Sequence, residues 1–193
     1  MIQGEEKTAE LVRRIEQESV RMSSLVEDLL LLARLDQSRE MAMEPVDIST
    51  LIKEAVASAR AAGPSHEISV VLPEEDLFVL GDSLRIHQVI ANLLANARIH
   101  TPAGTKIIVT GKQDDSGTFV SVADNGPGLS DESQAKIFER FYRADPSRMR
   151  NGVEGLGLSI VDAVMNAHGG NVSVASELGK GATFTLFFPI QDL

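Results

Sequence analysis

The chain has 193 residues, with 28 acidic against 18 basic side chains, which gives a formal net charge of −10 at pH 7. A composition of 43% hydrophobic and 24% charged residues is typical of a globular protein and excludes a largely disordered chain. The acidic balance and 4% aromatic content argue against nucleic-acid binding, and the lack of cysteine excludes disulfides and thiolate metal sites.

The N-terminal segment is predicted to form a long helical arm. Residues 5–35 contain neither glycine nor proline, and the helix is expected to end by 36–38. Its apolar side chains fall on two series that repeat every seven residues, with Glu18 as the one polar member. These side chains are Leu11, Ile15, Met22, Leu25, Leu29 and Leu32. Such a stripe needs a partner, so the arm either lies on its own domain or packs against another helix.

The rest of the chain mixes helices and strands. Strands are predicted over 43–47, 67–72, 77–80, 106–112, 118–123, 171–176 and 182–188. Helices are predicted from Asp47 or Ser49 through Ala62, from Asp82 onward, over 131–140 and over 156–168. The polar stretch 143–155 is predicted to be a loop. Because antiparallel hairpins are mixed with helices, the pattern favours a two-layer α/β sandwich.

The familiar nucleotide-binding motifs are missing. There is no G-x-x-x-x-G-K-[ST], and Gly126-x-Gly128 does not continue into G-x-G-x-x-G. Instead, Asp124-Asn125-Gly126-Pro127-Gly128 directly follows a predicted strand. A carboxylate there can accept a hydrogen bond from an exocyclic amine such as that of adenine, while the glycines let the backbone approach a flat ligand. The alternative is a surface turn.

Three further segments have the residue types of a phosphate or cation site. Asn92 and Asn96 share one face of the predicted helix, and amide oxygens suit Mg²⁺; the alternative is that they cap nearby backbone. Gly155-Leu156-Gly157-Leu158 opens a helix whose N–H groups can bind an anion, or it is a glycine-rich helix cap. The segment 179–184 contains Thr183 and is otherwise a plain hairpin turn.

Together, in this order, the segments resemble the ATP-binding catalytic domain of sensor histidine kinases, of the gyrase, heat-shock chaperone, kinase and MutL ATPase superfamily. The stretch 82–97 resembles the N box, 124–128 the G1 box, 138–143 the F box, 155–158 the G2 box and 179–184 the last glycine box. Residues 22–35 resemble the second helix of the dimerisation and phosphoacceptor hairpin. The resemblance implies a Bergerat-type fold over 39–193, with residues 1–38 as the hairpin helix.

The resemblance also implies ATP and Mg²⁺ as cofactors and a role for each matching residue. Asp124 would bind the adenine amino group, Asn96 and Asn92 would hold Mg²⁺, and Arg143 would reach the triphosphate. Asn92 and Arg143 are the expected catalytic residues. The remaining nucleotide contacts implied are His100, Gly126, Gly128, Tyr142, Gly155, Leu156, Gly157, Leu158 and Thr183. Phe138 and Phe141 would anchor the ATP lid, residues 144–154.

Two departures from the family pattern stand out. The family often has Lys and Tyr three and four residues after the Mg²⁺-binding Asn, where this chain has Ile99 and His100. Ile99 cannot contact phosphate electrostatically, Arg98 is displaced by 100° around the helix, and His100 is either a phosphate or ribose contact or a polar helix end. None of the four histidines lies in a phosphoacceptor box. We therefore expect a cytoplasmic fragment of a membrane-anchored, homodimeric sensor, mainly monomeric by itself.

Chemistry separates kinases from hydrolases within the superfamily. The hydrolases carry a glutamate one turn before the Mg²⁺-binding Asn, where this chain has Asn92, which cannot act as a general base. The resemblance thus favours γ-phosphoryl transfer to a histidine outside this chain, with the parent's acceptor hairpin and a response regulator as partners. The alternative is a non-catalytic ATP-responsive module that acts through lid movement and docking of its arm.

Overall fold

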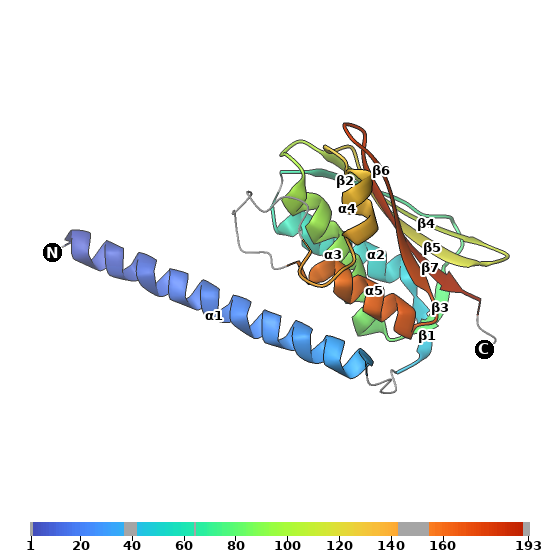
Figure 1. The fold of residues 1–193 in the computed structure, drawn as a ribbon, viewed down its shortest axis with the longest axis horizontal. Helices are drawn as coiled ribbons and strands as arrows, with labels where there is room; N and C mark the ends of the chain where they lie inside the picture. Colours follow the sequence, from blue (N-terminus) through green and yellow to red (C-terminus); the bar gives the residue numbers. More distant parts are fainter. Residues whose placement is uncertain (1, 37–41, 64, 143–154, 191–193) are drawn as a thin grey trace.

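The computed structural model describes residues 2–36, 42–63, 65–142 and 155–190, without the side chains of 2–10, 17, 21 and 36. A long helix, α1 (Ile2–Asp36), projects from an α/β domain (Figure 1). Within the described ranges, no helix is both long and apolar enough to cross a membrane. The boundary expected at residues 38 and 39 lies outside the described residues.

A five-stranded sheet forms one layer of the domain. Its order is β2 (Glu67–Val71), β4 (Lys106–Asp114), β5 (Gly117–Asp124), β7 (Gly181–Pro189) and β6 (Asn171–Glu177). The β2–β4 pair is parallel and the other three pairs are antiparallel. Along β5 and β7 buried side chains alternate with more exposed ones, so that one face of the sheet is apolar.

Three helices form the second layer on that apolar face (Figure 1): α2 (Ile48–Ala61), α3 (Ser83–His100) and α5 (Gly157–Ala167). Each contributes fully buried aliphatic side chains to one continuous core, in which Ile52, Leu93 and Ile160 have no exposed surface. The two-layer α/β sandwich predicted from the sequence is therefore confirmed.

At two helices, a side chain that the sequence offers as the N-terminal cap is the cap in the structure. Asp47 accepts a hydrogen bond from the Thr50 N–H at the start of α2, and Asp82 accepts one from the Arg85 N–H at the start of α3. The helix predicted over 131–140 is shorter, because α4 (Asp131–Lys136) ends before Phe138. There the chain turns so that the Phe138 ring packs edge-on against Phe184, with ring centroids 6.3 Å apart.

The strand predicted over 77–80 begins and ends one residue later than predicted, and it does not join the main sheet. It is β3 (Phe78–Gly81), which pairs antiparallel with β1 (Glu44–Asp47) in a separate two-stranded sheet. Beyond β3, the Asp82 N–H donates to Nε2 of His168 at 3.0 Å, while Nδ1 of His168 contacts the Val164 carbonyl oxygen at 2.7 Å. His168 is 1% exposed, so it joins the end of β3 to the end of α5 inside the core.

Among the described side chains of the arm, those packed against the domain lie near its C-terminal end. Leu31 and Leu32 are 6% and 2% exposed and belong to the core, and α1 packs against α5. Asp28 accepts a hydrogen bond from the Gln88 amide at 3.4 Å. Farther along, Leu11, Ile15, Met22 and Leu29 remain exposed. The last turns of the stripe therefore lie on the domain, whereas packing of the rest against another helix stays a prediction.

Candidate functional site

Asp124 is the last residue of β5, where the central part of the sheet ends. Its strand partners are Ile107 of β4 and Ala182 of β7. The side chain has the same parity as buried Val122, so it points to the face that the helices cover. Its Oδ1 accepts the Gly126 N–H at 2.8 Å. Partial burial raises the pKa of Asp124, and hydrogen bonds from the Gly126 and Ala182 backbone partly offset that rise.

The loop after Asp124, which we name the base loop (residues 125–128), is fixed at both ends by backbone contacts. The Asn125 side chain accepts the Lys106 N–H at 2.7 Å, which secures the loop against β4. At its far end, Gly128 has a φ of 69°, and a Cβ built there would lie 2.1 Å from the Glu177 carbonyl oxygen. Glycine is required at this position because main chain approaches main chain.

The glycine-rich turn between β6 and β7 braces the base loop. The Gly179 N–H donates to the Pro127 carbonyl oxygen at 2.8 Å. Ser176 accepts the Leu129 N–H at 2.8 Å and donates its hydroxyl proton to the Gly181 carbonyl oxygen at 2.7 Å. The Gln134 side chain of α4 in turn bonds the backbone N–H and carbonyl of Ser176, both at 3.0 Å. The hairpin is therefore structural support for the base loop.

The two asparagines of α3 occupy one half-buried face of the helix. The Asn92 amide donates to the Gly157 carbonyl oxygen at 3.3 Å, which leaves its Oδ1 as an acceptor. Asn96 lies one turn further on, and its side-chain amide makes no hydrogen bond to the described part of the chain. Two amide oxygens on one accessible face are a donor set that fits a hard cation such as Mg²⁺.

The start of α5 has the features of an anion site. Leu156 precedes the helix without a side-chain cap, and no acidic residue lies in the first turn. Gly155 has a φ of 68°, and its carbonyl accepts the N–H of Phe141, which itself has a φ of 64°. Both residues are held in the left-handed region on either side of residues 143–154. The N–H groups of the first turn and the helix dipole favour a phosphate here.

The site lies along the C-terminal half of α3, between two contacts of this helix with other elements. Asn92 touches the start of α5, and Thr101, directly after α3, lies against Gly126 of the base loop. Nine residues of helix separate them, or roughly 13 Å at 1.5 Å per residue. The Asp124 carboxylate therefore lies near the end of α3, the uncapped start of α5 lies beside Asn92 at the middle of α3, and Asn96 lies between them.

Several predicted contacts are not brought to this site. Thr183 pairs with Ala123 and alternates with buried Ala182 and Phe184, so its side chain points to the opposite face of the sheet from Asp124. The Tyr142 hydroxyl turns toward α4 and donates to Ser133 at 3.3 Å. His100 is exposed at the end of α3, next to Thr101, and its contact with a phosphate or ribose stays a prediction. Phe141, predicted to anchor the lid, is 60% exposed.

Two predictions about basic residues have different outcomes. Arg143 and the predicted lid, residues 144–154, lie outside the described residues. The Arg98 guanidinium extends toward the end of α2, where a Cβ built on Gly63 would lie 3.2 Å from its Nη2. This direction agrees with the expectation that Arg98 does not replace the family's phosphate-binding lysine. Ile99 is 47% exposed and offers no charge.

Sequence reasoning missed the residues that support the site. Thr101 and His66 bridge α3 to the start of β2, and Ser176 and Gln134 support the glycine-rich turn. Their contacts link residues 35 to 47 positions apart, so no local pattern predicts the contacts themselves. The hydroxyl of Thr101 at a helix end was the only available signal.

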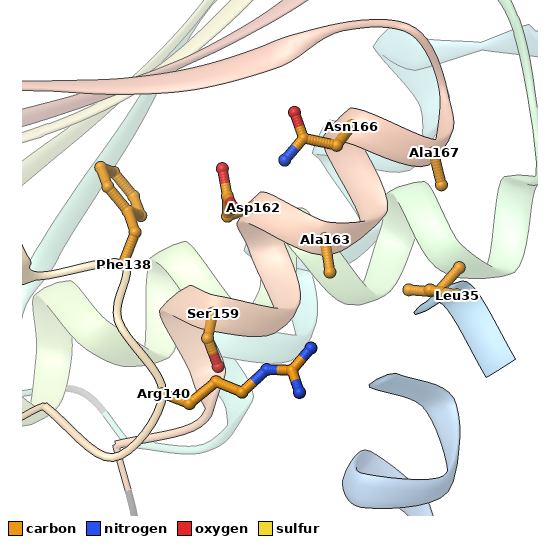
Figure 2. Close-up of a pocket in the computed structure, with 8 residues that line it drawn as sticks. All are labelled: Leu35, Phe138, Arg140, Ser159, Asp162, Ala163, Asn166 and Ala167. Carbon is orange, nitrogen blue, oxygen red and sulfur yellow. The ribbon is translucent and has the colours of Figure 1, made fainter. Parts of the chain in front are cut away.

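A separate pocket of about 380 Å³ lies between the arm and α5 (Figure 2). Leu35 of α1 forms one wall, and Phe138 and Arg140 form another. The floor comes from the outer face of α5, which contributes Ser159, Asp162, Ala163, Asn166 and Ala167. None of the predicted nucleotide contacts lines it, so this pocket is distinct from the site along α3.

Comparison with known sequences identifies the domain. Residues 81–192, more than half of the chain, match the family of histidine kinase-, DNA gyrase B- and HSP90-like ATPases. The probable sensor histidine kinase TcrY of Mycobacterium tuberculosis is 49% identical over 90% of this chain. The sensor histidine kinase TrcS of the same organism is 40% identical over 88% of it. The chain spans only 37% and 34% of the lengths of these two relatives.

Solved structures agree with the sequence relatives. The mycobacterial sensor histidine kinase MprB superposes with a TM-score of 0.69 at 30% identity, over 78% of this chain and 100% of that one. Full-length ShkA in complex with AMPPNP superposes with a TM-score of 0.72 at 33% identity, over 89% of this chain and 37% of that one. The chain therefore belongs to the histidine kinase-, DNA gyrase B- and HSP90-like ATPases, and its domain is an ATP-binding catalytic domain of the sensor histidine kinase type.

Proposed function

We propose that this chain is the nucleotide-binding part of a two-component sensor kinase, which holds Mg·ATP and presents the γ-phosphoryl group to a histidine on a separate helical hairpin. The observation that carries the proposal is the arrangement along α3. The half-buried Asp124 carboxylate lies near the end of α3 and the uncapped start of α5 lies beside Asn92 at its middle, with Asn96 between them. An extended nucleoside triphosphate has a matching length and order of groups.

In this proposal Asp124 accepts a hydrogen bond from the adenine amino group, while the N–H groups of residues 157–158 bind phosphate oxygens. Asn96 and Asn92 would hold Mg²⁺, which neutralises charge on the phosphates when bound. Arg143 is proposed to contact the triphosphate as well. The bound complex of ShkA with AMPPNP, an ATP analogue, supports a nucleotide site in this fold.

The proposed reaction is phosphoryl transfer and not hydrolysis. An imidazole nitrogen forms a bond to the γ-phosphorus while the bond to the β,γ-bridging oxygen breaks, ADP leaves, and the imidazole proton passes to solvent. Asn92 cannot take a proton from water, and its amide is engaged with the Gly157 carbonyl oxygen. The contribution of this chain is therefore positioning and charge neutralisation.

We further propose that α1 corresponds to the second helix of the acceptor hairpin, that residues 39–193 form the catalytic unit, and that a response regulator receives the phosphoryl group. The parent would be a membrane-anchored homodimer with this part in the cytoplasm. The names of the sequence relatives support a role in sensing. A non-catalytic ATP-responsive module remains a second candidate, because exposed Ile99 supplies no charge for phosphate.

The test is to incubate the chain with γ-labelled Mg·ATP, alone and with a separate acceptor-hairpin peptide. We expect no acid-labile label on the chain itself and label on the hairpin histidine, with Asn96→Ala reducing transfer and weakening the Mg²⁺ dependence of ATP binding. ATP binding without any transfer to the hairpin would favour the non-catalytic module. Strong labelling of any of the four histidines of this chain would exclude the need for an external acceptor.

A further inference from the structure

Thr101 lies where three segments of the chain meet. Its hydroxyl donates to the Ala97 carbonyl oxygen at 2.6 Å, and its Oγ1 lies 3.0 Å from Nε2 of His66. Its methyl group lies against the base loop, because a Cβ built on Gly126 would come within 2.6 Å of Thr101 Cγ2. One half-buried side chain thus joins the end of α3, the start of β2 and the base loop.

The hydrogen-bond roles in this cluster follow from the donor inventory. Because the hydroxyl proton of Thr101 is used by Ala97, the contact with His66 requires Nε2–H to donate to Thr101 Oγ1. Nδ1 of His66 then accepts the hydroxyl proton of Ser65 at 2.9 Å. The Ser65 carbonyl oxygen also accepts the Gly104 N–H at 2.7 Å, which fixes this loop beside the end of α3. His66 is therefore oriented and in turn orients Thr101.

A hydrogen bond from Gly126 connects Thr101 to Asp124, the carboxylate proposed to bind the base. Gly126, which lies against the Thr101 methyl group, donates its N–H to Asp124 Oδ1 at 2.8 Å. A Cβ on Gly126 would also lie 2.7 Å from that oxygen, so methyl group, loop and carboxylate are in close contact. A small displacement of Gly126 would redirect the carboxylate, since this bond fixes one of its two oxygens.

We propose that Thr101 and His66 are positioning residues that set the preference of the site for a purine with a 6-amino group. The inference rests on the proposed ATP-binding function and adds the residues that determine its base specificity. Neither residue is assigned a contact with the reacting atoms. Thr101 acts on Asp124 through Gly126, and His66 acts by fixing the Thr101 rotamer.

Two paired substitutions separate the parts of this bridge. Thr101→Val keeps the branched shape but removes the hydroxyl, whereas Thr101→Ser keeps the hydroxyl but removes the methyl group beside Gly126. His66→Ala removes the donor to Thr101, whereas the amide of His66→Gln can replace it. Thr185→Val is the matched control. Thr185 is also half-buried, but it lies on β7 and its side chain points to the face of the sheet opposite to that of Asp124.

The readout is the ratio of calorimetric affinities for ATP and for purine riboside triphosphate, which lacks the 6-amino group. We expect the wild-type chain to prefer ATP. Thr101→Val and His66→Ala should each lower ATP affinity by roughly three- to tenfold, as for one lost hydrogen bond, with little change for the analogue. Thr101→Ser should reduce the ratio as well, while His66→Gln should restore it toward wild type.

The outcomes distinguish this inference from the function on which it rests. If the wild-type chain binds neither nucleotide, both the proposed function and this inference are wrong. If the wild type prefers ATP but the variants keep the wild-type ratio, only the inference fails. Equal losses for both nucleotides would also overturn it, because they would indicate general loss of structure. Thermal unfolding of each variant identifies any that do not fold, and Thr185→Val should match the wild type in every measurement.

Discussion

The side-chain amide of Asn92 donates a hydrogen bond to the carbonyl oxygen of Gly157 at 3.3 Å. This bond joins the middle of α3 to the first turn of α5, two elements that are adjacent in space and 65 residues apart in sequence. The residue proposed to assist in holding Mg²⁺ therefore also fixes the start of the helix proposed to bind phosphate. Its two amide atoms have separate tasks, Nδ2 in the fold and Oδ1 toward the site.

Asn92→Ala should consequently affect both stability and nucleotide binding. The loss of one partly buried hydrogen bond is expected to lower the free energy of unfolding by about 0.5–1.5 kcal/mol. Urea denaturation measures that loss, and titration with Mg·ATP should show weaker binding in the folded variant. Unchanged values in both experiments would contradict the dual role. Asn96→Ala, which breaks no bond to the described residues, should weaken binding without the loss of stability.

Asp124→Asn tests the base carboxylate with little change of shape. The amide oxygen can still accept the Gly126 N–H, but the amide nitrogen then faces the donor amine of adenine. The loss of a hydrogen bond to a charged group, about 1.5–3 kcal/mol, corresponds to an affinity decrease of about ten- to more than a hundredfold. Calorimetry on the folded variant provides the measurement. An affinity equal to that of the wild type would remove Asp124 from the site.

His168 should make the stability of the domain depend on pH below neutrality. Burial lowers its pKa below 6.5, and the nearby Asp82 charge opposes this shift only in part. Unfolding therefore takes up a proton below pH 6.5, so stability is fully present above that pH and decreases as pH falls toward the folded-state pKa. The slope is at most about 1.4 kcal/mol per pH unit.

Thermal unfolding of the wild type and of His168→Gln between pH 7.5 and 5 tests this prediction. The variant has no titrating group at this position, so it should unfold at a lower temperature at pH 7.5 but show a smaller decrease on acidification. Parallel pH profiles for the two proteins would show that another group causes the dependence.

The arm offers neighbouring leucines with opposite environments. Leu32 is 2% exposed against the domain, whereas Leu29 is 41% exposed on the same helix. Leu32→Ala should weaken the docking of α1 on α5 by up to about 2–5 kcal/mol, and Leu29→Ala should change stability by less than about 0.5 kcal/mol. Hydrogen exchange in the last turns of α1 measures the difference. Equal protection in the two variants would mean that the arm is not held by its buried face.

Self-association should involve the exposed half of the apolar stripe. Met22 and Leu29 are 61% and 41% exposed, whereas Leu25 is partly buried against the domain and is a poor site for a test. One helix per chain with Glu18 in the stripe should pair weakly. We expect sedimentation to show a monomer at micromolar concentration, with association at higher concentration abolished by Met22→Glu/Leu29→Glu. A tight dimer unaffected by these charges would show that the interface lies elsewhere.

The order of elements was predictable because local signals determine it. Asp47, one of two candidates in the sequence, and Asp82 are the observed caps, and the alternation of apolar and polar residues indicated the strands near 106–112 and 118–123. The end of α4 was not predictable from periodicity, because Phe138 leaves the helix to contact Phe184, 46 residues away. The displacement of β3 likewise depends on its pairing with β1.

The composition of the site was predictable only in part. The motifs predicted that Asp124, the glycines and the two asparagines belong to one site, because each motif is local and its chemistry depends only on the residue types. The orientation of Thr183 depends on strand register, and a shift of one residue exchanges the two faces of a sheet. The bridge from His66 to Thr101 spans 35 residues and leaves no trace in local pattern.

The described contacts that dock α1 on the domain lie in its last turns, so a small tilt of the helix there moves its far end by a much larger distance. From Leu32 to Ile2 the helix extends roughly 45 Å at 1.5 Å per residue. Over that length a tilt of about 10° at the contact with α5 moves the far end by about 8 Å. A repacking of Leu31 and Leu32 that tilted α1 by this angle would therefore displace the opposite end of the helix by most of a helix width.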